Sequence, residues 1–315
     1  MTQKEKITHA IKEEALRLGF SGIGIAKAEY MEEEADRLEQ WLHGGNHGGM
    51  SYLEDHFDKR VDPTKLIPGT KSVISLMYNY YTEDVQQDEE APKIAMYALG
   101  KDYHKVVKKK IIKLFKWIEA NIGAIEGRCF VDSAPILERD WARRSGLGWV
   151  GKHTLLLNKN KGSYFFLGEI LLDLELDYDA PTKDHCGSCT RCIDACPTDA
   201  ISAEGYLVDG GKCISYLTIE LKDQIPEEFT DQMANYVFGC DICQQVCPWN
   251  KFSTPHEEPK FAGRRELLEL TRDEWHDLTD ETFDQIFFGS PLKRAKYSGI
   301  RRNLDFLKKS QLRGD

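Results

Sequence analysis

The spacing of apolar residues predicts a helix at the start of the chain and buried strands further on. A stripe of apolar side chains at helical spacing opens the sequence, and Gly19 follows it as a stop. This stripe consists of Ile7, Ile11, Ala15 and Leu18. The largely apolar runs Ser72 to Tyr81 and Gly162 to Leu176 predict one buried strand and two adjoining strands, respectively. The N-terminal part therefore mixes helices with strands, as in an α+β or an α/β domain.

A further helix with one buried stripe is predicted over Lys101 to Lys116. Seven lysines and His104 lie among the apolar residues of this segment. A run of charge is usually the solvated face of a helix, but in a chain that is acidic overall it is also typical of a surface that meets a polyanion. Both interpretations stay open.

Candidate chemistry follows the next predicted strand. The segment Cys129 to Arg144 predicts a strand that leads through Pro135 into a helix, with Asp132 at the end of the strand. Strand ends often carry functional side chains, but an acid before Ser-Ala-Pro is also a common turn or capping residue. The glycine-rich stretches His43 to Met50 and Gly146 to His153 allow backbone groups to approach a ligand, although for the first a plain flexible loop is the favoured interpretation.

Length and charge fit a cytoplasmic enzyme with more than one domain. The 315 residues leave room for two or three domains, and no apolar run is long enough to span a bilayer. No apolar signal segment opens the chain, which argues against a disulfide framework. The net charge of −10 looks wrong for a nucleic-acid binder, but the stretch from Pro291 onward is basic. The residues expected to attract a phosphate backbone there are Lys293, Arg294, Lys296, Arg301 and Arg302.

The strongest motif is a run of four cysteines closed by proline, HCGSCTRCIDACP at residues 185–197. Its spacing is the ferredoxin pattern for a 4Fe–4S cluster. Cys186, Cys189 and Cys192 lie on one tight loop and can ligate three corners of the same cluster. In two-cluster ferredoxins the fourth cysteine, here Cys196, ligates the other cluster, so this run predicts a second site.

A second run, CDICQQVCP at residues 240–248, supplies that site. It repeats the end of the first run but has Val237 where the first cysteine would be. Cys213, which stands alone between the runs, is the replacement that the sequence offers. We predict that the first cluster is ligated by Cys186, Cys189, Cys192 and Cys247. We predict that the second is ligated by Cys196, Cys213, Cys240 and Cys243.

Zinc is the alternative for these cysteines. Paired CxxC motifs also bind zinc in tetrahedral sites with four thiolates. Three-cysteine runs that end in Cys-Pro favour iron–sulfur chemistry instead. Cys129 has no counterpart in either run, and we expect it to be a small buried residue.

Several linked motifs give the chain a family resemblance. They are HGGNHGGMSYL, GKDYH, VDSAPILERDWARRSGLGWVGKHTLL, GSYFFLGEIL, both cysteine runs, CISYLTIE and SPLKRAKYSGIRRN. In this combination, over nearly the whole chain, the sequence resembles epoxyqueuosine reductase. The resemblance implies a cytoplasmic, cobalamin-dependent oxidoreductase with two 4Fe–4S clusters. Its reaction would remove the epoxide oxygen from epoxyqueuosine at the wobble base of tRNA, the last step of queuosine synthesis.

The same resemblance implies three parts and a set of partners. A cobalamin-binding α/β domain is expected over residues 1–178, a ferredoxin-like domain with both clusters over 179–255, and a C-terminal helical, HEAT-like segment over 256–315. The expected partners are tRNA that carries epoxyqueuosine and a low-potential electron donor of the flavodoxin or ferredoxin type. We expect a monomer that does not enter a membrane.

The resemblance also assigns roles to single residues. Asp132 matches the proton donor, which would need a dry pocket to stay protonated near neutrality. Arg139 is expected to orient the substrate or the corrinoid. The further candidates for the corrinoid cleft are His153, Ser163, Tyr216 and Asp241. The chain has no DxHxxG cobalamin-ligand motif, so the corrinoid is implied by the resemblance alone.

Two rival functions stay open on the sequence. One is a reductive dehalogenase-like enzyme that acts on a small molecule and also pairs a corrinoid with two clusters. The other is a non-catalytic electron carrier, which would need no glycine-rich cleft in its N-terminal part. A corrinoid absorbance in the purified protein would separate an enzyme of either kind from the carrier.

Overall fold

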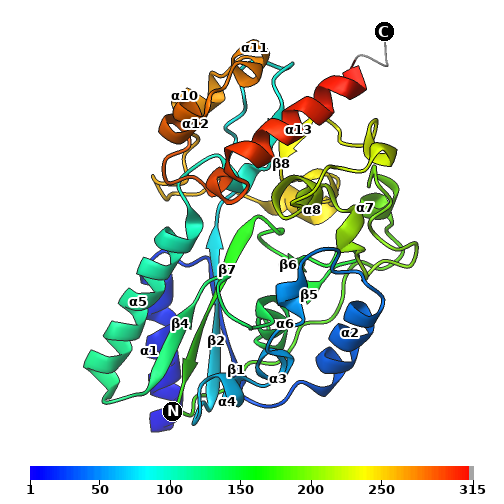
Figure 1. The fold of residues 1–315 in the computed structure, drawn as a ribbon. Helices are drawn as coiled ribbons and strands as arrows, with labels where there is room; N and C mark the ends of the chain where they lie inside the picture. Colours follow the sequence, from blue (N-terminus) through cyan, green and yellow to red (C-terminus); the bar gives the residue numbers. More distant parts are fainter. Residues whose placement is uncertain (312–315) are drawn as a thin grey trace.

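A four-stranded antiparallel sheet lies at the centre of the N-terminal part (Figure 1). The structure is a computed structural model that describes residues 1–311. The strands follow the order β1 (Gly22–Lys27), β2 (Ser72–Asn79), β7 (Phe165–Leu172) and β4 (Gly127–Phe130). Every neighbouring pair is antiparallel. Of the two predicted classes, α+β therefore describes this sheet, and α/β is wrong because no parallel crossover joins its strands.

The strand β7 also corrects a prediction about Gly162 to Leu176. This segment forms one strand, not two adjoining ones. The strand stays unbroken because β7 pairs with β2 along its whole length, from Phe165 opposite Asn79 to Leu172 opposite Ser72. Both β2 and β7 lie inside the sheet, and their side chains are almost all buried.

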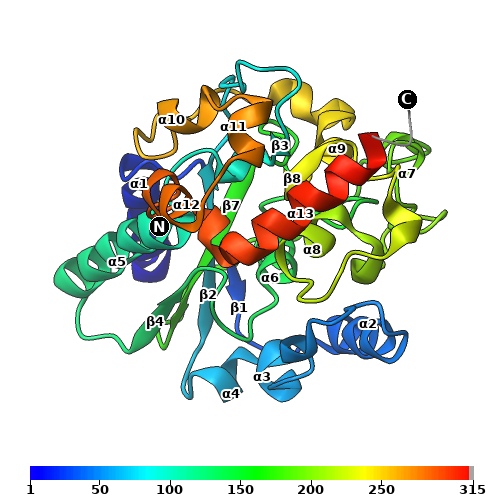
Figure 2. The same cartoon turned by 45° about the horizontal axis from the view of Figure 1, so that its top comes forward.

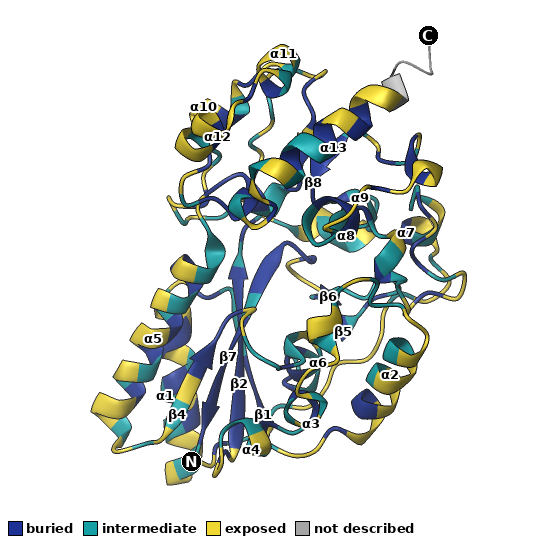
Figure 3. Ribbon diagram, viewed as in Figure 1, coloured by how far each residue is buried: buried dark blue, intermediate teal, exposed yellow. Residues whose placement is uncertain are grey.

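Helices cover both faces of the sheet. The helices α1 (Gln3–Arg17) and α5 (Tyr103–Ile122) pack on one face, and α6 (Glu138–Arg144) packs on the other (Figure 3). Both helices predicted from apolar spacing are confirmed, with buried stripes that include Ile11 on α1 and Ile111 on α5. Figure 3 shows their outer faces exposed, where the lysines of α5 lie.

The cysteine-rich and C-terminal segments pack together beyond the end of the sheet (Figure 2). One apolar core joins residues of the 91–99, 214–238 and 267–307 segments, with Trp275, Phe283 and Phe287 at its centre. The helices here are α7 (Arg191–Asp194), α8 (Ile214–Ile219), α9 (Ile242–Gln245), α10 (Arg265–Leu268), α11 (Arg272–His276), α12 (Asp280–Ile286) and α13 (Lys296–Gln311). Two short strands, β3 (Lys93–Ile94) and β8 (Tyr236–Phe238), pair in parallel within this core.

The remaining α-helices and strands range from two to twelve residues in length. They are α2 (Glu32–His43), α3 (Phe57–Val61), α4 (Pro63–Leu66) and the strand pair β5 (Trp149–Val150) and β6 (Leu156–Leu157). Among the residues that the structure describes, no helix has both the length and the apolar character needed to cross a bilayer.

Candidate active site

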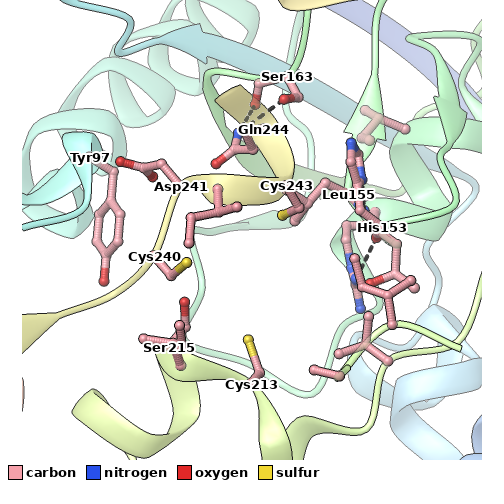
Figure 4. A pocket seen from close by; sticks show the side chains of 18 of the residues that line it. Tyr97, His153, Leu155, Ser163, Cys213, Ser215, Cys240, Asp241, Cys243 and Gln244 are labelled. Atoms are coloured by element: carbon pink, nitrogen blue, oxygen red, sulfur yellow. Dashed lines mark hydrogen bonds between the residues drawn. The ribbon is translucent and has the colours of Figure 1, made fainter. Parts of the chain in front are cut away.

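A cavity of about 440 Å³ lies between the central sheet and the cysteine-rich segment (Figure 4). Much of its wall is apolar, with Phe165 and Leu155 on the side of the sheet and Ile242 on the opposite side. The cavity opens at a rim that carries the exposed residues Asp132 and Arg139. Such a cavity suits a large, mostly apolar ligand that needs a few polar contacts.

Four of the predicted cluster ligands lie together on a side of the cysteine-rich segment that does not line the cavity. They are Cys186, Cys189, Cys192 and Cys247. Burial raises the pKa of the Cys192 thiol to about 11, and the nearby thiol of Cys247 is the next cause of the rise. Burial likewise raises the pKa of Cys247, with contributions from Cys186 and Cys189. The structure therefore brings Cys247 of the second run next to the first three cysteines of the first run.

The other four predicted ligands line the cavity itself. They are Cys196, Cys213, Cys240 and Cys243. Burial raises the pKa of Cys240 to about 12, and Cys213 and Cys196 add to the rise. Burial is also the largest cause of the raised pKa of Cys243, followed by Cys240 and Cys213. Cys213, assigned by elimination from the sequence, thus lies beside the cysteines with which it was grouped.

Single helical turns arrange the thiols within each run. The helices α7 and α9 have only four residues each and pack against each other. Cys192 follows Cys189 by three residues in the first run, and Cys243 follows Cys240 by three in the second, a spacing that puts both side chains on the same side of a turn. The described residues contain no three His, Cys, Asp or Glu side chains arranged to hold a single metal ion. Thiolates around a cubane bind separate iron atoms, so they need not converge on one point.

Asp132 lies at the mouth of the cavity in the loop after β4. Its backbone φ of 43° is in the left-handed region, which non-glycine residues rarely adopt. Its carboxylate accepts a short hydrogen bond from the hydroxyl of Tyr103 and lies 3.6 Å from Nε2 of His104. The Asp132 side chain is 62% exposed, so the dry pocket expected around it is not observed. The reason is its position on the open rim of the cavity.

The first turn of α5 holds the partners of Asp132. The Asp102 side chain caps this helix and also hydrogen-bonds to Nδ1 of His104 at 2.8 Å. Burial lowers the pKa of His104, but its hydrogen bonds to Asp102 and Asp132 outweigh burial and raise the pKa to about 9. A cationic imidazole is therefore held between two carboxylates near neutral pH. The Tyr103 ring stacks on Phe166 of β7 at 4.1 Å between ring centroids, which fixes its hydroxyl at the rim.

Arg139 and His153 line the cavity from neighbouring segments. Arg139 is anchored by a hydrogen bond of 2.6 Å from Nη1 to the carbonyl of Thr154. His153 is buried, its Nδ1 accepts the N–H of Leu155, and its Nε2 has no hydrogen-bond partner among the described residues. Burial lowers the pKa of His153 to about 4, so the ring is neutral near neutral pH. Its Nε2 is available to a ligand in the cavity (Figure 4).

Ser163 and Asp241 are two further predicted residues that line the cavity. The Ser163 hydroxyl accepts a hydrogen bond of 3.0 Å from Nε2 of Gln244 (Figure 4). Asp241 is buried and accepts the backbone N–H of Met96 at 2.7 Å. Burial raises its pKa to about 6.

Tyr216 does not line the cavity but holds the glycine-rich loop His43 to Met50. Its hydroxyl accepts the backbone N–H of Gly49 at 2.7 Å. A Cβ added to Gly48 would lie 2.9 Å from the Tyr216 ring, and Gly48 also has a positive φ of 57°. The N–H of Gly210 donates to the carbonyl of Asn46 at 2.6 Å. These glycines therefore let the loop dock on the cysteine-rich segment.

The basic C-terminal residues are engaged in intramolecular contacts to different degrees. Arg302 donates hydrogen bonds to the carbonyls of Leu217, Leu221 and Asp223. Arg294 makes two hydrogen bonds of 3.0 Å with Glu220. Of the rest, Lys293 pairs with Asp284, Arg301 pairs with Asp305 and bonds to the His276 carbonyl, and Lys296 is exposed. Residues 312–315 of this basic stretch lie outside the described part.

The sequence reasoning missed several residues at the site. Tyr103 and His104 lie beside Asp132, although the sequence placed them only on a basic helix. Glu138, six residues after Asp132, was given no role from the sequence, and it accepts the Asp132 backbone N–H. Glu169, in the middle of β7, was missed altogether. A charged residue inside an otherwise apolar strand, as in FFLGEILL, is the signal by which it might have been found.

Comparison with known proteins gives two family matches. Residues 185–250 match the family described as "4Fe-4S double cluster binding domain", and residues 60–133 match "Epoxyqueuosine reductase QueG, DUF1730". The chain is 54% identical over 308 residues to the epoxyqueuosine reductase of Cellulophaga algicola, covering 98% of this chain and 100% of that one. It is 43% identical to the epoxyqueuosine reductase of Vibrio cholerae, covering 95% of this chain and 82% of that longer one.

Solved structures show similar folds. An epoxyqueuosine reductase in complex with an epoxyqueuosine-modified tRNA-Tyr stem loop aligns with a TM-score of 0.89 and 28% identity, over 96% of this chain and 80% of that one. The Bacillus subtilis enzyme, described with its catalytic aspartate loop swung out of the active site, aligns with a TM-score of 0.88 and 28% identity, over 96% and 81%. A reductive dehalogenase, described with a mechanism for B12-dependent dehalogenation, aligns with a TM-score of 0.51 and 15% identity, over 99% and 37%. This last likeness concerns the fold alone.

Proposed function

The chain belongs to the epoxyqueuosine reductase family, an oxidoreductase family, and from that premise we propose that it reduces epoxyqueuosine in tRNA to queuosine. The observation that carries this proposal is the arrangement of two cysteine groups in series. One group lies away from the cavity, and the other lines the same cavity as Asp132. Reduction of a substrate at that rim needs electrons and protons at the same place, and this arrangement offers a source of each.

The two clusters are proposed to carry electrons in sequence. The first would be held by Cys186, Cys189, Cys192 and Cys247, and the second by Cys196, Cys213, Cys240 and Cys243. The match of residues 185–250 to a double-cluster domain supports two 4Fe–4S clusters. Electrons would enter at the first cluster and leave at the second, because only the second group lines the cavity. Clusters of this kind transfer single electrons at low potential.

The cavity is suited to a corrinoid. A corrin ring has apolar faces and an edge of amide side chains, and the lining combines apolar side chains with the free Nε2 of His153 and the hydroxyl of Ser163. These two residues and Asp241 would hold the edge of the ring, and Arg139 would lie near it at the rim. When bound, a corrinoid supplies a reducible cobalt centre that takes part in breaking carbon–oxygen bonds. Tyr216 is not part of this set, because it binds the glycine loop instead.

Asp132 is proposed as the proton donor. Conversion of an epoxide to an alkene consumes two electrons and two protons, and the oxygen leaves as water. The Tyr103 hydroxyl and the His104 ring orient the Asp132 carboxyl toward the open rim. A modified base bound over the rim would exclude water from Asp132 and so provide the dry surroundings that general acid catalysis needs.

The remaining assignments follow from this function. The partners would be tRNA that carries epoxyqueuosine and a low-potential donor of the flavodoxin or ferredoxin type. We propose a monomer in the cytoplasm, where tRNA is modified, and three parts over residues 1–178, 179–255 and 256–315. A dehalogenase function is not favoured, since the likeness to the dehalogenase is limited to 15% identity.

A turnover assay tests the proposal. The anaerobically purified chain, supplied with cobalamin and a strong reductant, is incubated with a tRNA stem loop that carries epoxyqueuosine. We expect queuosine to form, as seen by mass spectrometry of the digested RNA. A loaded and reduced protein that leaves epoxyqueuosine unchanged would overturn the proposed reaction.

A further inference from the structure

Two carboxyl groups lie beneath Asp132 and have no role in the mechanism so far. Glu138 is the first residue of α6, and its Oε1 accepts a hydrogen bond of 2.6 Å from the backbone N–H of Asp132. Glu169 lies in the middle of β7, opposite Ser75 on β2 and Phe130 on β4. Its side chain is fully buried, and neither carboxyl oxygen has a hydrogen-bond partner of ordinary geometry among the described residues.

The two carboxyl groups lie close enough to influence each other. Burial raises the pKa of Glu138 to about 7, and the charge of Asp132 adds to the rise. Burial also raises the pKa of Glu169 well above its ordinary value, and the neighbouring Glu138 carboxyl raises it further. Two carboxylates close together in buried surroundings repel each other, and the cationic His104 ring offsets this at Glu138 but not at Glu169. A proton held between them removes the repulsion and gives Glu169 a hydrogen-bond partner.

We propose that Glu138 and Glu169 share one proton and that this carboxyl pair positions Asp132 for its role as proton donor. With the proton on Glu169, Glu138 remains a carboxylate and accepts the Asp132 N–H strongly. The loop needs such an anchor because Asp132 adopts a strained left-handed backbone. Glu138 and Glu169 are thus positioning residues, and this inference rests on the proposed function of Asp132.

The groups that face the pair come from the neighbouring elements. They are the Asp132 carboxyl after β4 and, from α5, the cationic His104 ring and the neutral Tyr103 hydroxyl. The sheet contributes only the uncharged neighbours of Glu169 on β2 and β4. His104 lies 3.6 Å from Asp132 and also lowers the pKa of Glu138, but it does not act on Glu169, so one shared proton is needed to relieve the remaining repulsion within the pair.

Infrared spectroscopy of the whole chain tests the shared proton without any turnover. Glu169→Gln keeps the shape of the side chain but cannot hold an acidic proton, and Glu126→Gln replaces an exposed glutamate next to β4 as the control. At neutral pH we expect the C=O stretching band of a protonated carboxyl that shifts in D₂O. The band should be reduced in Glu169→Gln and retained in Glu126→Gln. An unchanged band in Glu169→Gln would overturn the shared proton.

Steady-state kinetics tests the positioning of Asp132. Glu138→Ala removes the acceptor of the Asp132 N–H, and we expect kcat to fall by about 100-fold with little change in KM, because small misplacements of a reacting group cost rates of that order. Glu138→Gln keeps an amide oxygen that can accept the same N–H and should recover most of the rate. A Glu138→Ala variant with the kcat of the unmodified chain would contradict the positioning role.

The two proposals can fail separately. If Asp132→Asn leaves turnover intact while the infrared band depends on Glu169, the proton donor is misassigned and the shared proton stands. If Asp132→Asn abolishes turnover while the band does not depend on Glu169, the carboxyl pair is misassigned and the proposed function stands.

Discussion

At the scale of single residues, the surroundings of each carboxyl group decide what it can do. Asp132 is exposed on a rim and is oriented by a tyrosine and a histidine. Asp241 is buried and bound to a backbone N–H, and Glu169 is buried without one. Only the exposed group can contact a large substrate that approaches from outside, so Asp132 is the member of this set that can donate a proton to it.

Replacing Asp132 by asparagine tests this assignment. The substitution preserves the shape of the side chain but removes its acidic proton, so we expect single-turnover rates to fall by about 100-fold or more. The absorbance of the clusters and the corrinoid should stay unchanged. Asp58→Asn, at an exposed position on α3, serves as the control. Turnover at the original rate would remove the proposed role of Asp132.

Substitutions of Arg302 and Lys296 test a structural role for the first residue and an RNA-binding role for the second. Arg302 satisfies three backbone carbonyls near α8, so we expect Arg302→Ala to lower the free energy of unfolding by about 2 kcal/mol. Lys296 is exposed, and Lys296→Ala should leave stability unchanged while weakening tRNA binding and its dependence on salt. Denaturant titration measures the free energy of unfolding, and tRNA binding at several salt concentrations measures the affinity and its dependence on salt. If tRNA binding is unchanged in Lys296→Ala, Lys296 is an ordinary surface residue.

At the scale of elements, each cysteine run contains one short helix, α7 or α9, and contributes thiols to both cysteine groups. Cys247 belongs to the second run but lies with the first group of thiols, and Cys243 of the same run lies with the second group. Under the proposed assignment, neighbours in sequence would ligate different clusters and so link the two loops. Cys196 makes the reciprocal exchange, since it lies with Cys213 and Cys240.

Serine substitutions at the two positions test the exchange. Cys247→Ser should perturb the cluster that lies away from the cavity, and Cys243→Ser should perturb the one beside it. We expect electron paramagnetic resonance of the reduced proteins to show that each variant alters a different cluster signal. The same signal altered in both variants would contradict the exchange of ligands.

The glycine loop gives a second test at this scale. Gly48 and Gly45 both have positive φ values, 57° and 68°, so alanine is strained at either position. Only at Gly48 would the new Cβ also meet the Tyr216 ring, at 2.9 Å, whereas Gly45 has nothing within 4 Å. We expect Gly48→Ala to lower the free energy of unfolding by about 1 to 3 kcal/mol more than Gly45→Ala does. Equal losses would show that the loop does not depend on this contact.

At the scale of the whole molecule, the sequence predicted well what depends on spacing. Periodic apolar residues located α1, α5 and β2, and the two runs located the cysteine groups, including Cys213 between them. The helices, the strand and the cysteine runs are local features. Cys213 could be assigned because no other cysteine in this region was left to supply the missing ligand.

Features that depend on long-range contacts were not predictable in the same way. The antiparallel pairing of β7 with β2 joins segments about 90 residues apart, and no local pattern gives its direction. The exposed position of Asp132 and the burial of Glu169 beneath it depend on how α6 packs across the sheet. The contact of Tyr216 with the glycine loop likewise appears only when distant segments meet.

The proposed reaction depends on two iron–sulfur clusters that feed electrons to the cavity. Quantifying iron, acid-labile sulfide and zinc on one anaerobically purified sample tests this most directly. Two 4Fe–4S clusters predict about eight iron and eight sulfide per chain and no stoichiometric zinc. Stoichiometric zinc without acid-labile sulfide would contradict the account.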